Sequence, residues 1–156
     1  MIWDGAPFAG AKLAAMLGDA LLVYRRDDKP GIPFPDMLDL PGGGREGDET
    51  PAECALRELA EEFGVFVGVD RVHYHRAYYL ADHATMSHFL AVNLTEEEVA
   101  SVRFGDEGQD WALLPAADFI ADDDAVPRLR EWLGHYCAAE AVLRRLGTTP
   151  DTSVEL

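Results

Sequence analysis

Positive charge is scarce in this chain of 156 residues. Its 13 lysine and arginine residues stand against 29 aspartate and glutamate residues, so the formal net charge is −16 at pH 7. A nucleic-acid backbone and an anionic membrane are also strongly negative, and such a chain would repel both. We therefore expect no nucleic-acid partner and no membrane partner. A small anionic substrate would need cations to bridge it to the protein.

Cysteine and long apolar runs are also lacking. Cys54 and Cys137 are the only cysteines, too few for a disulfide framework in a chain of this length, and we expect both to be ordinary thiols. No stretch approaches the roughly 20 apolar residues of a membrane span. The first residues, Met1 to Gly5, have neither the basic region nor the apolar run of a signal peptide. We expect a cytoplasmic protein.

The length and composition predict one folded unit. Apolar residues make up 48% of the chain, which argues against disorder, and 156 residues suffice for a core. We see no internal repeat and no linker. We expect a single domain over residues 1–147 and a flexible tail over residues 148–156.

The clearest local pattern is a helix that begins after Thr50 and ends at Gly64. Thr50, Pro51 and Glu53 form a typical helix start with a capping box. Gly64 is able to take the left-handed conformation that ends helices. A buried stripe is predicted from the apolar residues spaced at i, i+3, i+4 and i+7, namely Leu56, Leu59, Ala60 and Phe63.

The same helix carries three glutamates, Glu58, Glu61 and Glu62, roughly opposite the apolar stripe. A solvated acidic face is the simplest interpretation. However, like charges at these spacings destabilise a helix, and no lysine lies between Gly43 and Val65 to compensate. Mg²⁺ is bound by oxygen ligands together with substrate phosphates. Three glutamates around one turn therefore indicate a divalent-metal site, in which the metal would remove their mutual repulsion.

The segment from Gly43 to Val65 resembles the Nudix box at every fixed position. Gly43 is followed after five residues by Glu49, and after seven more by the run Arg57-Glu58-Leu59-Ala60-Glu61-Glu62-Phe63-Gly64-Val65. The preceding Leu40-Pro41-Gly42-Gly43 is similar to the family's lead-in. This resemblance implies an α/β fold, the Nudix α/β/α sandwich with a mixed β-sheet between helices. It also implies divalent-metal hydrolysis of a nucleoside diphosphate linked to another moiety.

The resemblance further implies roles for individual residues. Glu58, Glu61 and Glu62 would bind Mg²⁺, or alternatively Mn²⁺, together with the backbone carbonyl of Gly42. Many relatives take one more glutamate from a later loop, for which Glu107 is the best match here, with Asp106 and Asp110 as alternatives; a plain acidic surface loop is the other interpretation. The base that accepts the proton of the attacking water would be Glu58 or Glu107. Supporting residues would be Gly43 and Gly64, with Glu49 and Arg57 joined in an ion pair.

Candidate substrate contacts lie outside the box. Arg25 and Arg26 end a predicted strand and suit either solvent or a phosphate group. Tyr79 and His88 flank a turn where aromatic rings could stack on a base, although strand packing is the simpler interpretation. His73 and His75 alternate, so we expect them to share one strand face, but no third ligand with comparable spacing supports zinc.

Apolar runs and turn residues predict the remaining elements. Strands are expected at 11–17, 20–24, 37–40, 65–69, 72–80, 86–94 and 111–114, and helices at 95–100, 115–120 and 126–146, the last covering the second face of the sheet. Gly18-Asp19 predicts a hairpin turn, residues 29–35 a proline-rich loop, and the glycines 42–44 a turn.

Three functions other than a small-nucleotide hydrolase remain. A catalytically silent Nudix-fold nucleotide-binding or regulatory module usually lacks box carboxylates, and this chain has them all. An isoprenyl diphosphate isomerase needs a cysteine in its pocket, for which Cys54 is no obvious match. An RNA pyrophosphohydrolase is disfavoured by the charge of −16. We expect a nucleoside triphosphate as substrate, then a nucleotide sugar, and either a monomer or a homodimer.

Overall fold

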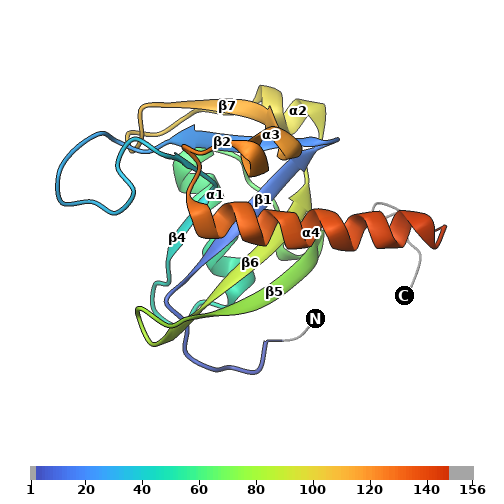
Figure 1. Ribbon diagram of the computed structural model, residues 1–156, viewed down its shortest axis with the longest axis horizontal. Helices are drawn as coiled ribbons and strands as arrows, with labels where there is room; N and C mark the ends of the chain where they lie inside the picture. Colours follow the sequence, from blue (N-terminus) through green and yellow to red (C-terminus); the bar gives the residue numbers. More distant parts are fainter. Residues whose placement is uncertain (1–2, 148–156) are drawn as a thin grey trace.

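The computed structural model describes residues 3–147, so the predicted tail over residues 148–156 lies outside the described part. Within it, seven strands form one mixed sheet with the order β3-β2-β1-β6-β5, while β4 pairs with β1 and β7 with β2 (Figure 1). The central pair, β1 (Gly10–Leu17) and β6 (Thr85–Asn93), is parallel, and the other strand pairs are antiparallel. This is the mixed sheet that the sequence predicts.

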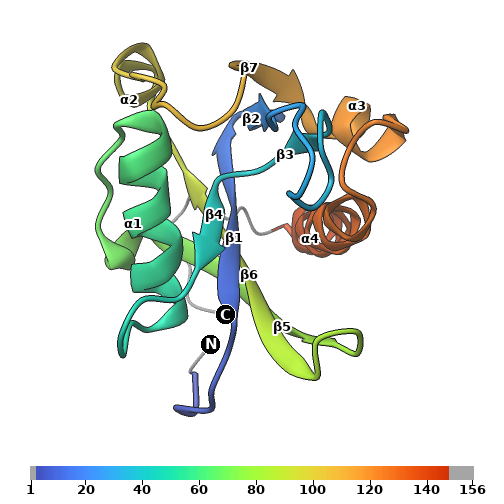
Figure 2. The same ribbon diagram turned by 90° about the vertical axis from the view of Figure 1, so that its left-hand side faces the viewer.

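Strand β1 changes its partner along one edge. Its last residues pair with β2 (Ala20–Arg25) across the Gly18-Asp19 turn, which confirms the predicted hairpin. Its first residues, Gly10 to Lys12, pair instead with β4 (Gly42–Gly44). Because β2 and β4 both use this edge of β1, the sheet divides there (Figure 2). The chain passes between them through β3 (Leu38–Asp39), which pairs with β2.

Helices lie on both faces of the sheet (Figure 2). Helix α1 (Pro51–Phe63) buries Leu56, Leu59 and Phe63 against one face, in a core cluster that includes Leu13, Leu90 and Val92. Helix α4 (Pro127–Arg145) buries Leu129, Trp132 and Tyr136 against the other face. The alternation of side chains along β1 and β6 supplies both cores, since successive residues point to opposite faces. The predicted α/β/α sandwich is confirmed.

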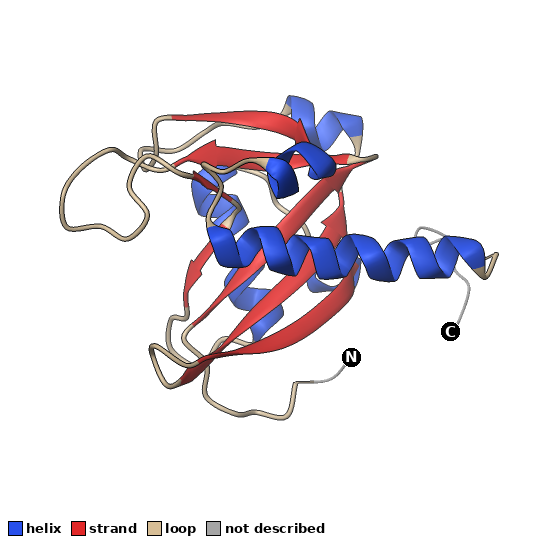
Figure 3. Cartoon of the chain, viewed as in Figure 1, coloured by secondary structure: helices blue, strands red, loops and turns tan. Residues whose placement is uncertain are grey.

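The remaining elements complete the two layers. Strand β5 (Val72–Leu80) pairs with β6, and β7 (Asp110–Pro115) pairs with β2. Helices α2 (Glu96–Ala100) and α3 (Ala116–Ala121) are short, and a capping box of Thr95 and Glu98 begins α2. Between β2 and β3 the proline-rich segment forms the loop that projects from the sheet in Figure 3. Within residues 3–147, no helix has both the length and the hydropathy that crossing a bilayer requires.

Two predicted elements are wrong. The glycines 42–44 form strand β4 rather than a turn, because without side chains they can lie directly against β1. A Cβ on Gly42 would collide with the carbonyl oxygen of Ala11. Residues 65–69 form no strand; Val65 is buried and Phe66 is exposed, which imitates a strand pattern, but no neighbouring strand pairs with this segment.

Candidate metal centre

Helix α1 is positioned by the signals that its sequence carries. The Thr50 side chain accepts a hydrogen bond from the Glu53 N–H, and the Glu53 carboxylate accepts one from the Thr50 N–H, which confirms the capping box. At the other end, Gly64 is left-handed with φ 67°, and its N–H donates to the Ala60 carbonyl. The helix therefore has fixed ends, and these fix which residues face β4.

Glu62 does not point into solvent, because β4 lies along the acidic side of α1. Glu62 Oε1 accepts a hydrogen bond of 2.9 Å from the Gly42 N–H. Burial raises the pKa of the Glu62 carboxyl to about 8, although Lys12 and the Gly42 N–H both act to lower it. The helical pattern correctly placed the glutamates opposite the apolar stripe. The sequence could not show that a strand of glycines, β4, lies against this acidic side of α1.

Glu58 also faces β4. Its carboxylate occupies the space that a Gly43 side chain would need, so a larger residue at position 43 would displace the end of the Glu58 side chain. Burial raises the pKa of Glu58, while the neighbouring Arg57 acts to lower it. Glu61, by contrast, is 57% exposed. The three glutamates therefore differ in environment, with two against β4 and one at the surface.

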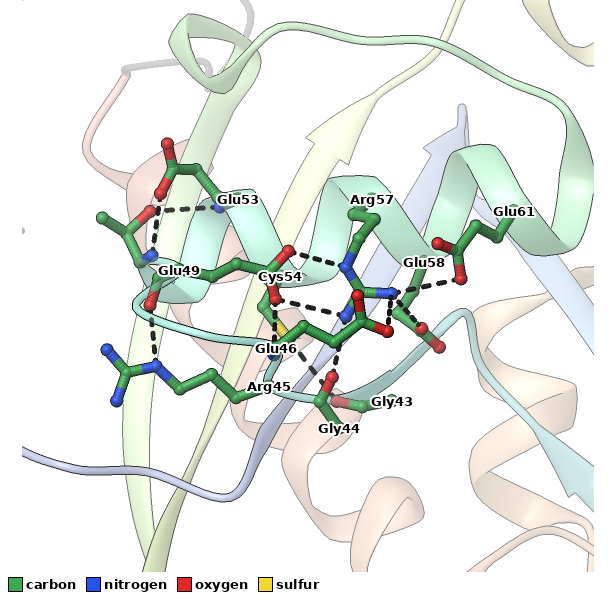
Figure 4. Close-up of polar contacts among 11 residues, drawn as sticks. Gly43, Gly44, Arg45, Glu46, Glu49, Glu53, Cys54, Arg57, Glu58 and Glu61 are labelled. Carbon is green, nitrogen blue, oxygen red and sulfur yellow. Dashed lines mark hydrogen bonds and ion pairs between the residues drawn. The ribbon is translucent and has the colours of Figure 1, made fainter.

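Arg57 lies at the centre of a group of carboxylates, shown in Figure 4. Its Nε lies 2.6 Å from Glu49 Oε2 and its Nη2 lies 3.2 Å from Glu49 Oε1, so the predicted ion pair is present and is bidentate. Nη1 contacts Glu58 at 2.7 Å and Glu61 at 3.1 Å, and Glu46 lies 3.4 Å away. Its hydrogen bond lowers the pKa of Glu49. We call Arg57 and these four glutamates the Arg57 cluster.

A second group of charges, which the sequence did not suggest, lies beside the start of β4. Asp39 is only 2% exposed, and its carboxylate contacts Lys12 Nζ at 3.0 Å and Arg26 Nη1 at 2.8 Å. It also accepts a hydrogen bond of 3.0 Å from the Tyr24 hydroxyl. Burial by itself raises the pKa of Asp39, but Lys12 and Arg26 outweigh it and hold the pKa below its usual range. We call these four residues the Asp39 cluster.

Lys12 connects this cluster to the candidate metal ligands. Its ammonium group donates to the Gly42 carbonyl at 3.2 Å and to the Leu40 carbonyl at 3.2 Å. The Gly42 oxygen, which the family resemblance assigns to the metal, thus accepts a hydrogen bond from a lysine here. A lone lysine within a strand gives no sequence signal for this role, because its partners are distant in sequence.

Glu107 lies in the loop between α2 and β7, and hydrogen bonds join this loop to α1 and to β2. The Gly105 N–H donates to the Glu62 carbonyl at 2.8 Å, and the Gln109 N–H donates to the Arg25 carbonyl at 2.8 Å. Glu107, between these two anchors, is exposed. The structure therefore joins its loop to the end of α1 but does not bring its carboxylate into contact with Glu58 or Glu62.

The predicted substrate arginines hold the proline-rich loop. Arg26 belongs to the Asp39 cluster and also donates to the Pro33 carbonyl at 2.9 Å, while Arg25 donates to the Asp36 carbonyl at 2.6 Å. Tyr79 is 64% exposed on β5. His88 is 5% exposed, so its ring lies within the protein, and its role as a substrate contact stays a prediction.

The histidines do not form a zinc site. A bulge between Val72 and Tyr74 reverses the alternation of β5, so His73 and His75 do not share a face as predicted. His73 Nε2 lies 2.8 Å from the Tyr136 hydroxyl of α4, whereas His75 Nε2 lies 2.7 Å from His88 Nδ1. Burial lowers the pKa of His88 to about 4, so this imidazole pair is neutral at neutral pH.

The donor set around β4 fits a hard divalent cation. Carboxylates of Glu58 and Glu62 and the Gly42 carbonyl lie around one strand without side chains, and such oxygens are the ligands that Mg²⁺ prefers. The raised pKa of Glu62 means that burial disfavours the charged form of its carboxyl group, and a bound cation would stabilise that form. Within the described residues, however, no three His, Cys, Asp or Glu side chains are already gathered around one point.

Comparisons with known proteins agree with this architecture. A family model for the NUDIX domain matches residues 9–136. RNA pyrophosphohydrolases of Acidiphilium cryptum and Gluconacetobacter diazotrophicus are 44% and 43% identical over 55 and 58 residues, which is 35% and 33% of this chain. The chain spans about a third of the length of these relatives, 32% and 35%.

Solved structures resemble this fold over more of its length. A NUDIX hydrolase from Nitrosomonas europaea has a TM-score of 0.68 at 18% identity and covers 92% of this chain and 76% of its own. A bifunctional NMN adenylyltransferase/ADP ribose pyrophosphatase from Francisella tularensis, complexed with AMP and a Mn ion, has a TM-score of 0.55 at 23% identity and covers 69% of this chain and 35% of its own. Together with the family model, the box and the sandwich, these findings show that the chain belongs to the Nudix family.

Proposed function

We propose that this protein is a Mg²⁺-dependent hydrolase, able to use Mn²⁺, that cleaves the diphosphate linkage of a nucleoside diphosphate derivative. The observation that carries the proposal is the position of Glu58 and Glu62 against the bare backbone of β4. There, oxygen ligands and excess negative charge lie beside a strand that a phosphate could approach closely. Nudix hydrolases generally use divalent metals, which supports the same conclusion.

Each residue has a stated role in this proposal. Glu58, Glu61, Glu62 and the Gly42 carbonyl would hold the cation, and Glu107 would join them from its loop. When bound, the cation polarises phosphoryl oxygens, lowers the pKa of water and neutralises the charge of the transition state. Glu58 or Glu107 accepts the proton of the attacking water, whose oxygen bonds to phosphorus as the bridging P–O bond breaks. Arg57 keeps Glu58 and Glu61 in place, and its pair with Glu49 fixes the loop before α1.

The proposed substrate is a small nucleotide, with a nucleoside triphosphate first and a nucleotide sugar second. The net charge of −16 disfavours an RNA substrate, whose backbone would be repelled along its length. The RNA pyrophosphohydrolases match this chain over only about a third of either sequence, so they support the reaction more than the substrate.

A catalytically silent nucleotide-binding module is the second candidate. One observation favours it, namely that Arg57 and Lys12 already contact the carboxylates and the carbonyl that a metal would use. In such a module these internal cations would replace the metal permanently.

A hydrolysis screen distinguishes the two candidates. We expect phosphate or nucleotide release with Mg²⁺ and none with EDTA, over a panel of nucleoside triphosphates, nucleotide sugars, ADP-ribose and dinucleoside polyphosphates. Glu62→Gln should abolish release while the protein stays folded, whereas Glu131→Gln, an exposed change on α4, should have no effect. Nucleotide binding without turnover would support the silent module instead.

A further inference from the structure

A cavity of about 380 Å³ lies behind β4, and we call it the β4 cavity. Its lining includes the glycines of β4 and residues from β1, β6, the β5–β6 turn and α4, among them Gly43, Gly44, Lys12, Ser87, His83 and Arg128. In Figure 1 the start of α4 and the β5–β6 turn both lie on the side of the molecule where β4 is found. The β4 cavity therefore shares strand β4 with the candidate metal centre.

Only backbone separates the two sites. The Glu58 carboxylate occupies the side-chain space of Gly43 on the α1 side, while Gly43 and Gly44 line the β4 cavity. Gly43 and Gly44 have no side chains, and Arg57 donates to the Gly44 carbonyl at 2.8 Å, so a diphosphate beside Glu58 and Glu62 could extend past these glycines toward the β4 cavity. Whatever group follows the diphosphate in the substrate would then reach the residues of the β4 cavity.

The β4 cavity gathers basic groups in a strongly acidic protein. Lys12, His83 and Arg128 line it, against a net charge of −16 for the chain. Their availability differs: Lys12 is already neutralised by Asp39, and His83, which is 62% exposed, has only a loose contact of 3.4 Å with Asp82.

Arg128 is the least engaged of the three. It forms no ion pair with a carboxylate among the described residues, and its guanidinium lies 5.7 Å from the Phe34 ring and 5.8 Å from the Trp132 ring. The aromatic rings position the guanidinium but leave its N–H donors free of carboxylates. Helix α4 begins one residue earlier, at Pro127, with no side-chain cap and no acidic residue in its first turn, so the positive end of its dipole adds to the charge of Arg128.

We propose that Arg128, assisted by His83, binds a phosphate that follows the scissile diphosphate, which makes the protein selective for nucleoside triphosphates over nucleotide sugars. A guanidinium binds phosphate oxygens through two parallel hydrogen bonds, whereas a neutral sugar in the same place gains no charge interaction. This inference rests on the proposed function, since it assumes that the diphosphate is cleaved beside Glu58 and Glu62.

The test compares Arg128→Gln with Arg145→Gln, which removes the same charge from the exposed far end of α4. We expect Arg128→Gln to lower kcat/KM for a nucleoside triphosphate by about 10- to 100-fold and kcat/KM for a nucleotide sugar by less than about twofold. His83→Gln should produce a smaller loss of the same kind. Arg145→Gln should leave both values unchanged.

A second measurement needs neither metal nor turnover. In EDTA at low ionic strength, calorimetry should show inorganic tripolyphosphate binding to the unaltered protein and to Arg145→Gln, and binding at least about fivefold weaker to Arg128→Gln. Circular dichroism establishes that each variant is folded.

The results that overturn the inference differ from those that overturn the proposed function. Equal losses for both substrate classes in Arg128→Gln, or tripolyphosphate binding that is absent or identical in Arg128→Gln and Arg145→Gln, would refute the role of Arg128. In that case Mg²⁺-dependent hydrolysis and its loss in Glu62→Gln would still stand. No hydrolysis of any diphosphate would instead refute the proposed function. The calorimetry would still show whether Arg128 contributes to binding tripolyphosphate.

Discussion

The two charged groups beside β4 are opposites in composition. In the Arg57 cluster one guanidinium serves four carboxylates, whereas in the Asp39 cluster one carboxylate serves two cations and a tyrosine. Asp39 is buried, while Glu46 and Glu61 of the other group are largely exposed. The single charge of Asp39 is therefore balanced inside the protein by Lys12 and Arg26. The Arg57 cluster, by contrast, retains negative charge that is accessible to solvent.

This difference separates a structural role from a functional one. A buried carboxylate that loses its partners costs several kcal/mol, so the Asp39 cluster holds β2, β3 and β1 in register. Excess carboxylate at a partly exposed site is tolerated only at some cost in repulsion, which a divalent cation would remove.

The largest expected effect is on activity. Glu62→Gln keeps the shape and can keep the hydrogen bond from the Gly42 N–H, but it removes a proposed metal ligand. We expect kcat to fall by about 10³-fold, equivalent to about 4 kcal/mol, with little change in thermal stability. Steady-state kinetics with Mg²⁺ and a thermal melt check both expectations. Unchanged kcat in a folded variant would remove Glu62 from the site.

The second effect is on stability, which the first variant should leave almost unchanged. Asp39→Asn leaves Lys12 and Arg26 without their carboxylate, so we expect a loss of about 3 kcal/mol in the free energy of unfolding. Urea denaturation measures it. The control is Asp36→Asn, because Asp36 is 51% exposed and its ion pair with Arg25 is 3.8 Å long. A similar cost for both variants would mean that the Asp39 cluster has no special structural role.

A smaller loss of stability is expected from Arg57→Gln. It removes the bidentate pair with Glu49 and leaves the glutamates repelling one another, at a cost of about 2 kcal/mol in the free energy of unfolding. Arg71→Gln is the matched comparison. Arg71 forms a bidentate pair with Glu98, as Arg57 does with Glu49, but Arg71 is more exposed. We expect about 0.5 kcal/mol there. Mg²⁺ should restore part of the stability of Arg57→Gln but none of that of Arg71→Gln.

The smallest effect is expected from the His75–His88 pair, whose imidazoles are neutral because they are partly buried and have no carboxylate partner among residues 3–147. Burial lowers the pKa of His88 to about 4, so between that value and its ordinary 6.5 the unfolded chain binds a proton that the folded protein does not. Stability should therefore fall as the pH decreases from 6.5 toward 4, with a slope on the order of 1 kcal/mol per pH unit. Urea midpoints across this range should show a flatter profile for His88→Gln. An identical slope in both proteins would assign the titration to other groups.

Local signals in the sequence predicted the part of the site carried by α1. Thr50, Glu53 and Gly64 fix the ends of the helix through contacts within four residues, and the Arg57–Glu49 pair spans only eight. The bulge that separates His73 from His75 was not predictable, because it depends on how β5 pairs with β6. The Asp39 cluster was missed for the same reason, since Lys12 and Asp39 are 27 residues apart.

The sequence by itself determined the family, the order of most elements and the three glutamates on one side of α1, since these depend on residue types and spacings along the chain. Only the tertiary structure decided that β4 lies against those glutamates, partly burying Glu58 and Glu62 and leaving Glu61 exposed. It also decided that Lys12 reaches the Gly42 carbonyl and that Arg128 and His83 line one cavity. These facts depend on strand pairing and helix docking between distant segments, which no local pattern encodes.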